Sequence, residues 1–422
     1  MLIEYRHIRF WLCSVMMLLC LACSSDSADD GSPTAKKPSQ LEIYVYTPEK
    51  PVVTRTEEVE KIDPDENEKV VNTLQIWVFV AEEKTSGNGT LHVGDLVGYL
   101  SPQISTPSST EYIGKYQLTV SELFVELHPK VNVYVVANGA STGLDLSSAT
   151  SMDDLNNLAL IQDDGIHDYF GLSSPMTTAV SAEGLPMSGV LKAADVTPSL
   201  PVLKVTKPVT VIRAVSKVRF VFSRSKPYTS DEVYGSNQEL KITGISLDNG
   251  MIPKAEYLFL ASDFTNNYHE EGVHNCHPVT TGDAPYISGP DENGIALSPL
   301  AETASQIPEY ENPSAYTYTG EVTGQDYENL INTGIEEGHL AEIGKFYIRE
   351  SDKQVTGRIH YTIGNDATVK SSTFRMTRAG EFSRNHTWIV YGYFSAKELL
   401  SISSVNVLPW TTTYTDYVVP NW

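Results

Sequence analysis

The chain has 422 residues, which is long for a single hydrophobic core and favours two domains. Its formal net charge of −23 at pH 7 repels phosphate backbones, so nucleic acid is excluded as an expected partner. Its 23 tyrosines, 23 prolines and 28 glycines favour β structure that is interrupted by turns.

Residues 1–22 have the pattern of an export signal. Arg6 and Arg9 precede an apolar run that ends at Ala22 and is too short to span a bilayer. Residues 23–40 then form a polar tether that begins with Cys23. Ala22-Cys23 resembles the lipobox of bacterial lipoproteins, in which the cysteine is acylated. Ordinary signal cleavage beside an unmodified Cys23 is the alternative.

The segment 41–80 reads as a strand, a loop that a protease can cut, and a second strand. Leu41, Ile43 and Val45 alternate with polar or amphipathic side chains, which predicts a strand with one buried face. The polar run after it contains a single arginine, Arg55. Residues 74–80 are apolar on both faces, as in the centre of a sheet. We therefore expect residues 41–53 to be a removable strand and residues 54–69 to be the cleavage loop.

Most later elements are predicted to be strands. We expect a hairpin at 86–89, a short helix from 152 to about 160, a turn-rich stretch at 184–189, a linker-like passage at 192–204, a break near 213–216, a surface excursion at 262–312 and a helix at 326–333. The expected strands are 112–120, 123–127, 131–136, 241–247, 257–260, 346–348, 357–363, 374–376, 387–394 and 405–410. This pattern favours an all-β chain of two consecutive antiparallel sandwiches with one or two short helices, an N-terminal domain at 41–200 and a C-terminal domain at 201–422.

No pattern in the sequence indicates an enzyme, a metal site or a cofactor. His274, Cys276 and His277 offer at most three zinc ligands, so a polar loop with an unpaired thiol is the favoured interpretation. The acidic run 63–68 lacks the spacing of a calcium loop, and we expect it to be a solvated charged segment.

Several short motifs, in this order along the chain, resemble the fimbrillin family, the FimA/Mfa-like lipoprotein pilins of Gram-negative anaerobes. They are Leu21-Ala22-Cys23, Thr54-Arg55, the runs 74–79, 131–138, 186–189 and 213–218, and the later runs 346–351, 384–387 and 407–410. The resemblance implies two transthyretin-like Greek-key β-sandwich domains. It also implies export as an outer-membrane lipoprotein precursor, arginine-specific proteolysis and polymerisation by donor-strand exchange into a cell-surface fimbrium that serves in adhesion.

The resemblance also implies roles for particular residues. Cys23 would carry the lipid, including palmitate, and Arg55-Thr56 would be cut. The removable strand would contain Leu41, Ile43 and Val45, and the C-terminal donor region would contain Val405, Val407, Trp410 and Trp422. The implied partners are other pilin subunits, an arginine-specific protease and, before cleavage, the outer membrane. Stalk, tip and anchor roles remain open.

Two other classes of protein remain as alternatives. A surface lipoprotein that binds glycans without polymerising would present a concave aromatic platform. A glycoside hydrolase would need two facing carboxylates about 5–10 Å apart in a cleft.

Overall fold

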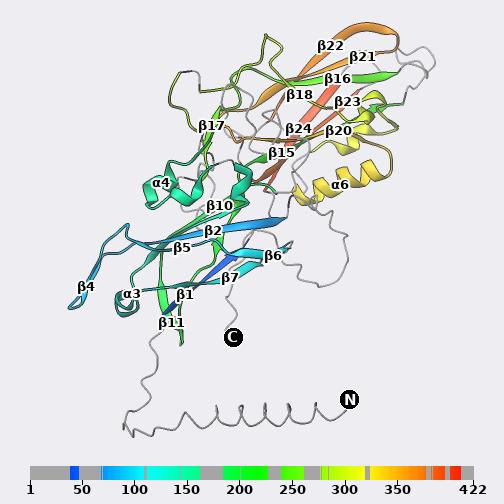
Figure 1. The fold of residues 1–422 in the computed structure, drawn as a ribbon. Helices are drawn as coiled ribbons and strands as arrows, with labels where there is room; N and C mark the ends of the chain where they lie inside the picture. Colours follow the sequence, from blue (N-terminus) through cyan, green and yellow to red (C-terminus); the bar gives the residue numbers. More distant parts are fainter. Residues whose placement is uncertain are drawn as a thin grey trace, which may run out of the picture. The chain divides into compact units, whose positions relative to one another are not determined.

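The computed structural model describes residues 39–46, 68, 70–108, 112–142, 144–161, 184–199, 201–226, 239–260, 276, 278–283, 285–318, 324–376, 382, 384–394 and 400–409. Within them the chain is mainly β, with three α-helices of several residues each (Figure 1). The all-β expectation is therefore confirmed.

Two sheets make up the first half of the described chain. The first, the β1 sheet, has the order β11-β12-β1-β13 with β7 paired to the other edge of β1. Its strands are β1 (Gln40–Tyr46), β7 (Tyr112–Thr119), β11 (Val196–Ser199), β12 (Val202–Val205) and β13 (Val209–Thr210).

The second sheet, the β2 sheet, has the order β14-β10-β8-β2-β5, and β6 also pairs with β2. Its strands are β2 (Val71–Val80), β5 (Leu96–Leu100), β6 (Gln103–Ser108), β8 (Val131–Ala137), β10 (Met187–Ala194) and β14 (Ile212–Arg213). The central position expected for residues 74–80 is confirmed, because β2 has β8 on one side and β5 and β6 on the other.

The β1 sheet and the β2 sheet pack face to face through one apolar core. Leu41, Ile43 and Val45 of β1 join Ile76 and Val78 of β2 in this core. The opposite face of β2 is also buried, because Trp77 and Phe79 pack in a second cluster that includes residues from later in the chain. Burial on both faces explains the unbroken apolar run of β2.

Two further sheets pack in the second half. One has the order β19-β15-β23-β24 with β20 on β15, and the other has the order β18-β16-β21-β22. Their strands are β15 (Ser216–Ser225), β16 (Leu240–Leu247), β18 (Ile295–Leu297), β19 (Glu309–Tyr310), β20 (Ala341–Ile348), β21 (Thr356–Ile363), β22 (Asp366–Arg375), β23 (His386–Phe394) and β24 (Leu400–Pro409). Their facing side chains form a single core, which includes Phe220, Ile359 and Trp388.

Small elements complete the fold. The predicted hairpin is present as β3 (Lys84–Ser86) and β4 (Gly89–Leu91), and β9 (Ala159–Ile161) pairs with β17 (Ala255–Tyr257). The predicted late helix is α6 (Gly324–Glu336). The predicted helix at 152 is α4 (Met152–Asn156), which begins with a Ser151–Asp154 capping box and ends earlier than expected.

Five local predictions were wrong. Residues 123–127 lie in helix α3 (Glu122–Leu127) rather than in a strand, because Ser121 caps the backbone N–H of Phe124. The stretch 184–189 enters β10, and 192–204 contains the hairpin β11–β12 instead of a linker. The strand expected at 257–260 is shorter and earlier, as β17. The excursion 262–312 contains β18, whose Ile295 and Leu297 are buried in the second-half core.

The break expected near 213–216 is confirmed, because β14 ends at Arg213 and β15 begins at Ser216. Sheet membership changes at this break. The described residues nevertheless belong to one compact unit, and the division into two domains at about residue 200 stays a prediction.

We expect Ile43→Ala to lower the free energy of unfolding by about 2–5 kcal/mol, because it leaves a cavity in the core between the two first-half sheets. Urea denaturation followed by tryptophan fluorescence measures this change. The control is Thr119→Ala on β7, an exposed position opposite Gln40, which should change stability by less than about 0.5 kcal/mol. Equal effects of the two substitutions would show that the inner face of β1 does not contribute to the core.

Candidate functional site

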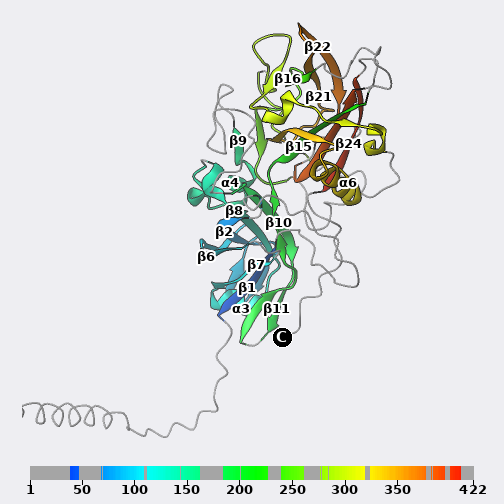
Figure 2. The same cartoon turned by 90° about the vertical axis from the view of Figure 1, so that its right-hand side faces the viewer.

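Strand β1 is held on both edges along its length. β7 pairs with it in antiparallel register from Gln40–Thr119 to Tyr46–Tyr112. On the other edge β12 pairs in parallel with Leu41 and Glu42, and β13 pairs in parallel with Val45 and Tyr46. Figure 2 shows β1 beside β7. We call the position between β7 and the pair β12 and β13 the β1 slot. An empty slot would leave two rows of backbone groups unpaired above an apolar floor.

The outer face of β1 is polar and has specific partners. Glu42 accepts a hydrogen bond from Gln117 Nε2 at 2.9 Å and lies 3.3 Å from Lys115 Nζ. Burial alone would raise the pKa of Glu42, but these contacts with Gln117 and Lys115 outweigh it and keep the pKa below its ordinary value. Lys204 of β12 lies over the ring of Tyr44, with its Nζ 4.8 Å from the centroid. The strands on both sides of the slot thus contribute a lysine to this face.

The chain leaves β1 beside the segment that links β13 to β14. The carbonyl of Tyr46 accepts a hydrogen bond from Val211 N at 2.9 Å. The next described residue is Glu68, whose own carbonyl accepts a hydrogen bond from Arg213 Nε at 3.0 Å. The two described ends of the connection therefore contact residues that are two positions apart in the sequence.

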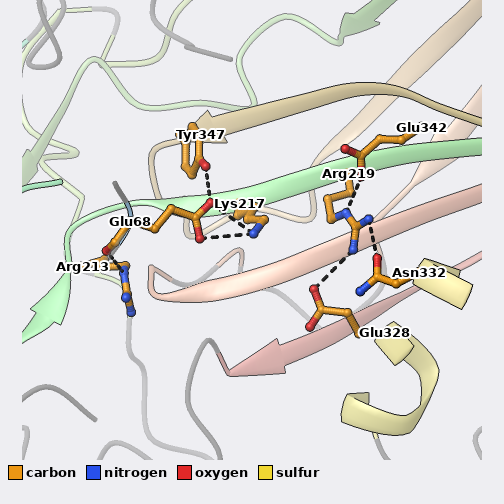
Figure 3. A network of polar contacts seen from close by, with 8 residues as sticks. All are labelled: Glu68, Arg213, Lys217, Arg219, Glu328, Asn332, Glu342 and Tyr347. Carbon is orange, nitrogen blue, oxygen red and sulfur yellow. Dashed lines mark hydrogen bonds and ion pairs between the residues drawn. The ribbon is translucent and has the colours of Figure 1, made fainter. Parts of the chain in front are cut away.

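Glu68 is fully buried and is held by charged and polar side chains from the second half (Figure 3). Its carboxylate lies 3.1 Å from Lys217 Nζ on β15 and also accepts a hydrogen bond from the hydroxyl of Tyr347 on β20. Burial, together with the nearby Glu68 carboxylate, raises the pKa of Tyr347, so this phenol stays a proton donor. We call Glu68, Arg213, Lys217 and Tyr347 the Glu68 anchor.

The residues that follow Glu68 are held by a buried asparagine. The side chain of Asn138 accepts a hydrogen bond from Asn72 N at 2.8 Å and donates to the carbonyl of Val70 at 2.7 Å. It also donates to the carbonyl of Leu185 at 2.8 Å. Asn138 has a φ of 55°, a left-handed conformation that asparagine adopts more readily than most residues. The chain is thus fixed at several successive points where it enters β2.

A second polar contact network joins β15 to α6. Arg219 Nε lies 2.5 Å from Glu342 Oε2 on β20, and the guanidinium also reaches two residues of α6, Glu328 at 3.3 Å and Asn332 at 2.7 Å (Figure 3). Arg219 and Lys217 point in the same direction from one strand, because they are two residues apart. Lys217 contacts Glu68 at the entry to β2, and Arg219 contacts helix α6.

A third group, the Arg384 cluster, is buried where β17 meets the strand ends of the second half. Arg384 and Glu350 are fully buried and form a two-point ion pair, with distances of 2.8 Å from Nε to Oε2 and 2.6 Å from Nη2 to Oε1. Arg384 also donates to the carbonyls of Tyr257 and Leu258. Glu256 of β17 completes the cluster and accepts a hydrogen bond from the backbone N–H of Glu350 at 3.3 Å.

Glu256 has a raised pKa because it is fully buried. Burial raises its pKa to about 8; the guanidinium groups of Arg384 and Arg349 oppose this rise, and the neighbouring carboxylate of Glu350 adds to it. Glu350 makes the direct ion pair with Arg384, whereas the hydrogen bond of Glu256 in this cluster comes from the backbone N–H of Glu350.

The structure describes only some of the predicted site residues. Leu41, Ile43 and Val45 are buried in β1, whereas Cys23, Arg55, Thr56, Trp410 and Trp422 lie outside the described residues. Val405 and Val407 lie in β24, and Val407 is paired with Trp388 of β23.

No sequence pattern predicts the Glu68 anchor. The expectation that the acidic run 63–68 is solvated is wrong for Glu68, since its carboxylate is buried against Lys217. The one available signal was the lysine and arginine placed within an apolar stretch at 213–218, because such charges are rarely buried without a partner.

Among the described residues, no group of three His, Cys, Asp or Glu side chains is arranged to hold a metal ion. None of the helices in this part of the chain is long and apolar enough to cross a membrane. Cys276 is half-buried, and its thiol donates to the carbonyl of Ser351 at 3.3 Å.

The raised pKa of Glu256 makes stability depend on pH. We expect the free energy of unfolding to fall as the pH rises from about 4.5 to about 8, and Glu256 should contribute at most about 1.4 kcal/mol per pH unit to this fall. The sign follows because the folded chain holds the Glu256 proton over a range in which the unfolded chain has lost it. Urea denaturation at pH 5, 6, 7 and 8 measures the slope.

Glu256→Gln should remove this part of the slope, since the amide does not titrate. Glu82→Gln, which replaces a surface carboxylate paired with Lys84, should leave the slope unchanged. A Glu256→Gln slope identical to that of the wild type would contradict the assignment of the proton to Glu256.

No family model matches the chain, and no curated protein matches it significantly. Solved structures do resemble it. A candidate cell adhesion protein from Bacteroides eggerthii has 13% identity and a TM-score of 0.45, and the match covers 90% of this chain and 98% of that one. A fimbrilin from Porphyromonas gingivalis has 11% identity and a TM-score of 0.43, over 90% and 100% of the two chains.

The fimbrial anchor protein Mfa2 from the same species has 8% identity and a TM-score of 0.33, over 88% and 98% of the two chains.

Proposed function

We propose that the chain is a structural subunit of a cell-surface fimbrium. It is exported as a lipoprotein anchored through Cys23, cut after Arg55 by an arginine-specific protease, and joined to other subunits when a strand of a neighbour enters the β1 slot. The observation that carries the proposal is the position of β1: it is a buried strand with partners on both edges, and the only arginine between it and β2 is Arg55.

The distribution of arginines supports a single cut. Between Arg9 and Arg213 the sequence contains no arginine except Arg55. Arg213 is itself buried in the Glu68 anchor, so a folded chain offers it poorly to a protease. A protease specific for arginine would therefore remove β1 and leave the rest of the first half whole.

The energetics favour exchange over simple loss of the strand. Burial of Leu41, Ile43 and Val45 contributes roughly 1.5–3 kcal/mol each, and each strand hydrogen bond adds about 0.5–1.5 kcal/mol. Loss of β1 thus costs on the order of 10 kcal/mol, which is comparable with the stability of a domain. A strand of matching pattern from another subunit offsets this cost, so cleavage favours assembly.

The donor comes from the C-terminal region in this proposal. Val405 and Val407 belong to β24, so their use as donors requires that β24 first separate from β23. The segment after Pro409, with Trp410 and Trp422, can donate without that step. A slot in one half and a donor from the other make a head-to-tail contact, which propagates as a filament.

The test uses purified chain that begins at Ser24, treated with an arginine-specific protease. We expect loss of the segment up to Arg55, followed by ladders on mild denaturing gels and filaments in electron micrographs. Arg55→Ala should stay monomeric under the same treatment, because it has no site in the loop. A wild-type chain that is cut at Arg55 yet remains monomeric would contradict the proposed assembly by strand exchange.

A further inference from the structure

We infer that Glu68 is a positioning residue that fixes where the removable part of the chain ends. Its buried anchor holds the entry to β2 in place when β1 leaves, so that the slot keeps its shape and proteolysis stops before Val70. The inference rests on the proposed release of β1 and concerns the part of the chain that stays behind.

The first argument is the burial of a charge. Carboxylates are seldom fully buried, and a buried one is costly unless charged and hydrogen-bonding groups surround it. Glu68 meets this requirement with Lys217 at 3.1 Å and the hydroxyl of Tyr347. The same residue just outside β2 could have remained in water, so its burial ties the chain to the second half at this point.

The second argument is the origin of the partners. Lys217 and Tyr347 lie on β15 and β20, which pair with each other directly at Lys217–Tyr347. Neither strand pairs with β1. Departure of β1 therefore leaves the contacts of the Glu68 carboxylate with Lys217 and Tyr347 in place.

The third argument is the separation of the two ends. Tyr46 is held at Val211 by a backbone hydrogen bond, while Glu68 is held at Arg213 by a side-chain hydrogen bond. The two contacts are made by residues two positions apart, Val211 and Arg213, but they involve different donor and acceptor atoms. The first is lost with β1, whereas the second is supported by Asn138, which fixes Val70 and Asn72 in the following residues.

The sequence provides a direct readout, because Lys69-Val70 directly follows the anchor and is a bond that trypsin recognises. We expect trypsin to remove β1 from the wild-type chain and to leave a retained fragment that begins at Thr56 or Ile62. In Glu68→Gln, a fragment that begins at Val70 should form at least about tenfold faster, since local opening sets the rate of cleavage. Intact-mass spectrometry over a time course distinguishes these fragments.

The controls separate local from global effects. Cleavage after Lys241, on strand β16, reports general unfolding and should not accelerate in parallel. Glu82→Gln, an exposed carboxylate in an ion pair, should behave as the wild type. Tyr347→Phe removes only a hydroxyl from the anchor and should give a smaller, several-fold rise, which tests the inference even if Glu68→Gln does not fold.

The outcomes are distinct. If wild-type chain is not cut at Arg55, or is cut and keeps β1, the proposed function fails. If β1 is released but Lys69-Val70 is cut at the same rate in wild type, Glu68→Gln and Tyr347→Phe, or if cleavage after Lys241 rises equally, the inference about Glu68 is overturned while the proposed function stands.

Discussion

The fold of the first half depends on the insertion of β1 between strands that do not pair with each other. Without β1, β7 would have no strand partner in that sheet, and β12 and β13 would lose the neighbour that aligns them. The inner side chains of the same strand also complete the core beneath it. A single short segment therefore provides both the hydrogen bonding and the apolar contacts that close the sandwich.

The fully buried carboxylates Glu68, Glu256 and Glu350 lie outside this segment. The Glu68 anchor and the Arg384 cluster draw on β15, β17 and β20 and on the residues that lead into β23. Buried ion pairs contribute little net stability compared with apolar packing, but breaking one is costly. They therefore suit points that must not move, whereas a removable strand is better held by apolar contacts and backbone hydrogen bonds that another strand can supply.

Much of the fold could be predicted from the sequence because apolar and polar residues alternate along many of its strands. Leu41 to Tyr46 and Val131 to Val136 alternate, and both are strands. Residues 123–127 form a helix instead of the predicted strand because Ser121 caps its first turn. Residues 192–204 contain a hairpin instead of the predicted linker, because Pro198 lies in an edge strand and Pro201 lies in the turn, where proline is tolerated. The Glu68 anchor could not be predicted, since its members are up to 279 positions apart and only the folded chain brings them together.

The pairing of β1 on both edges also affects how a joint between subunits would respond to tension. A strand seated in the slot and pulled along its own axis loads the hydrogen bonds to β7, β12 and β13 all at once, in shear. A strand attached at one edge and peeled sideways would instead lose its bonds one after another. A fibre built on such a slot would therefore resist a pull along its axis better than it would resist a bending force, because bending lifts one end of the inserted strand.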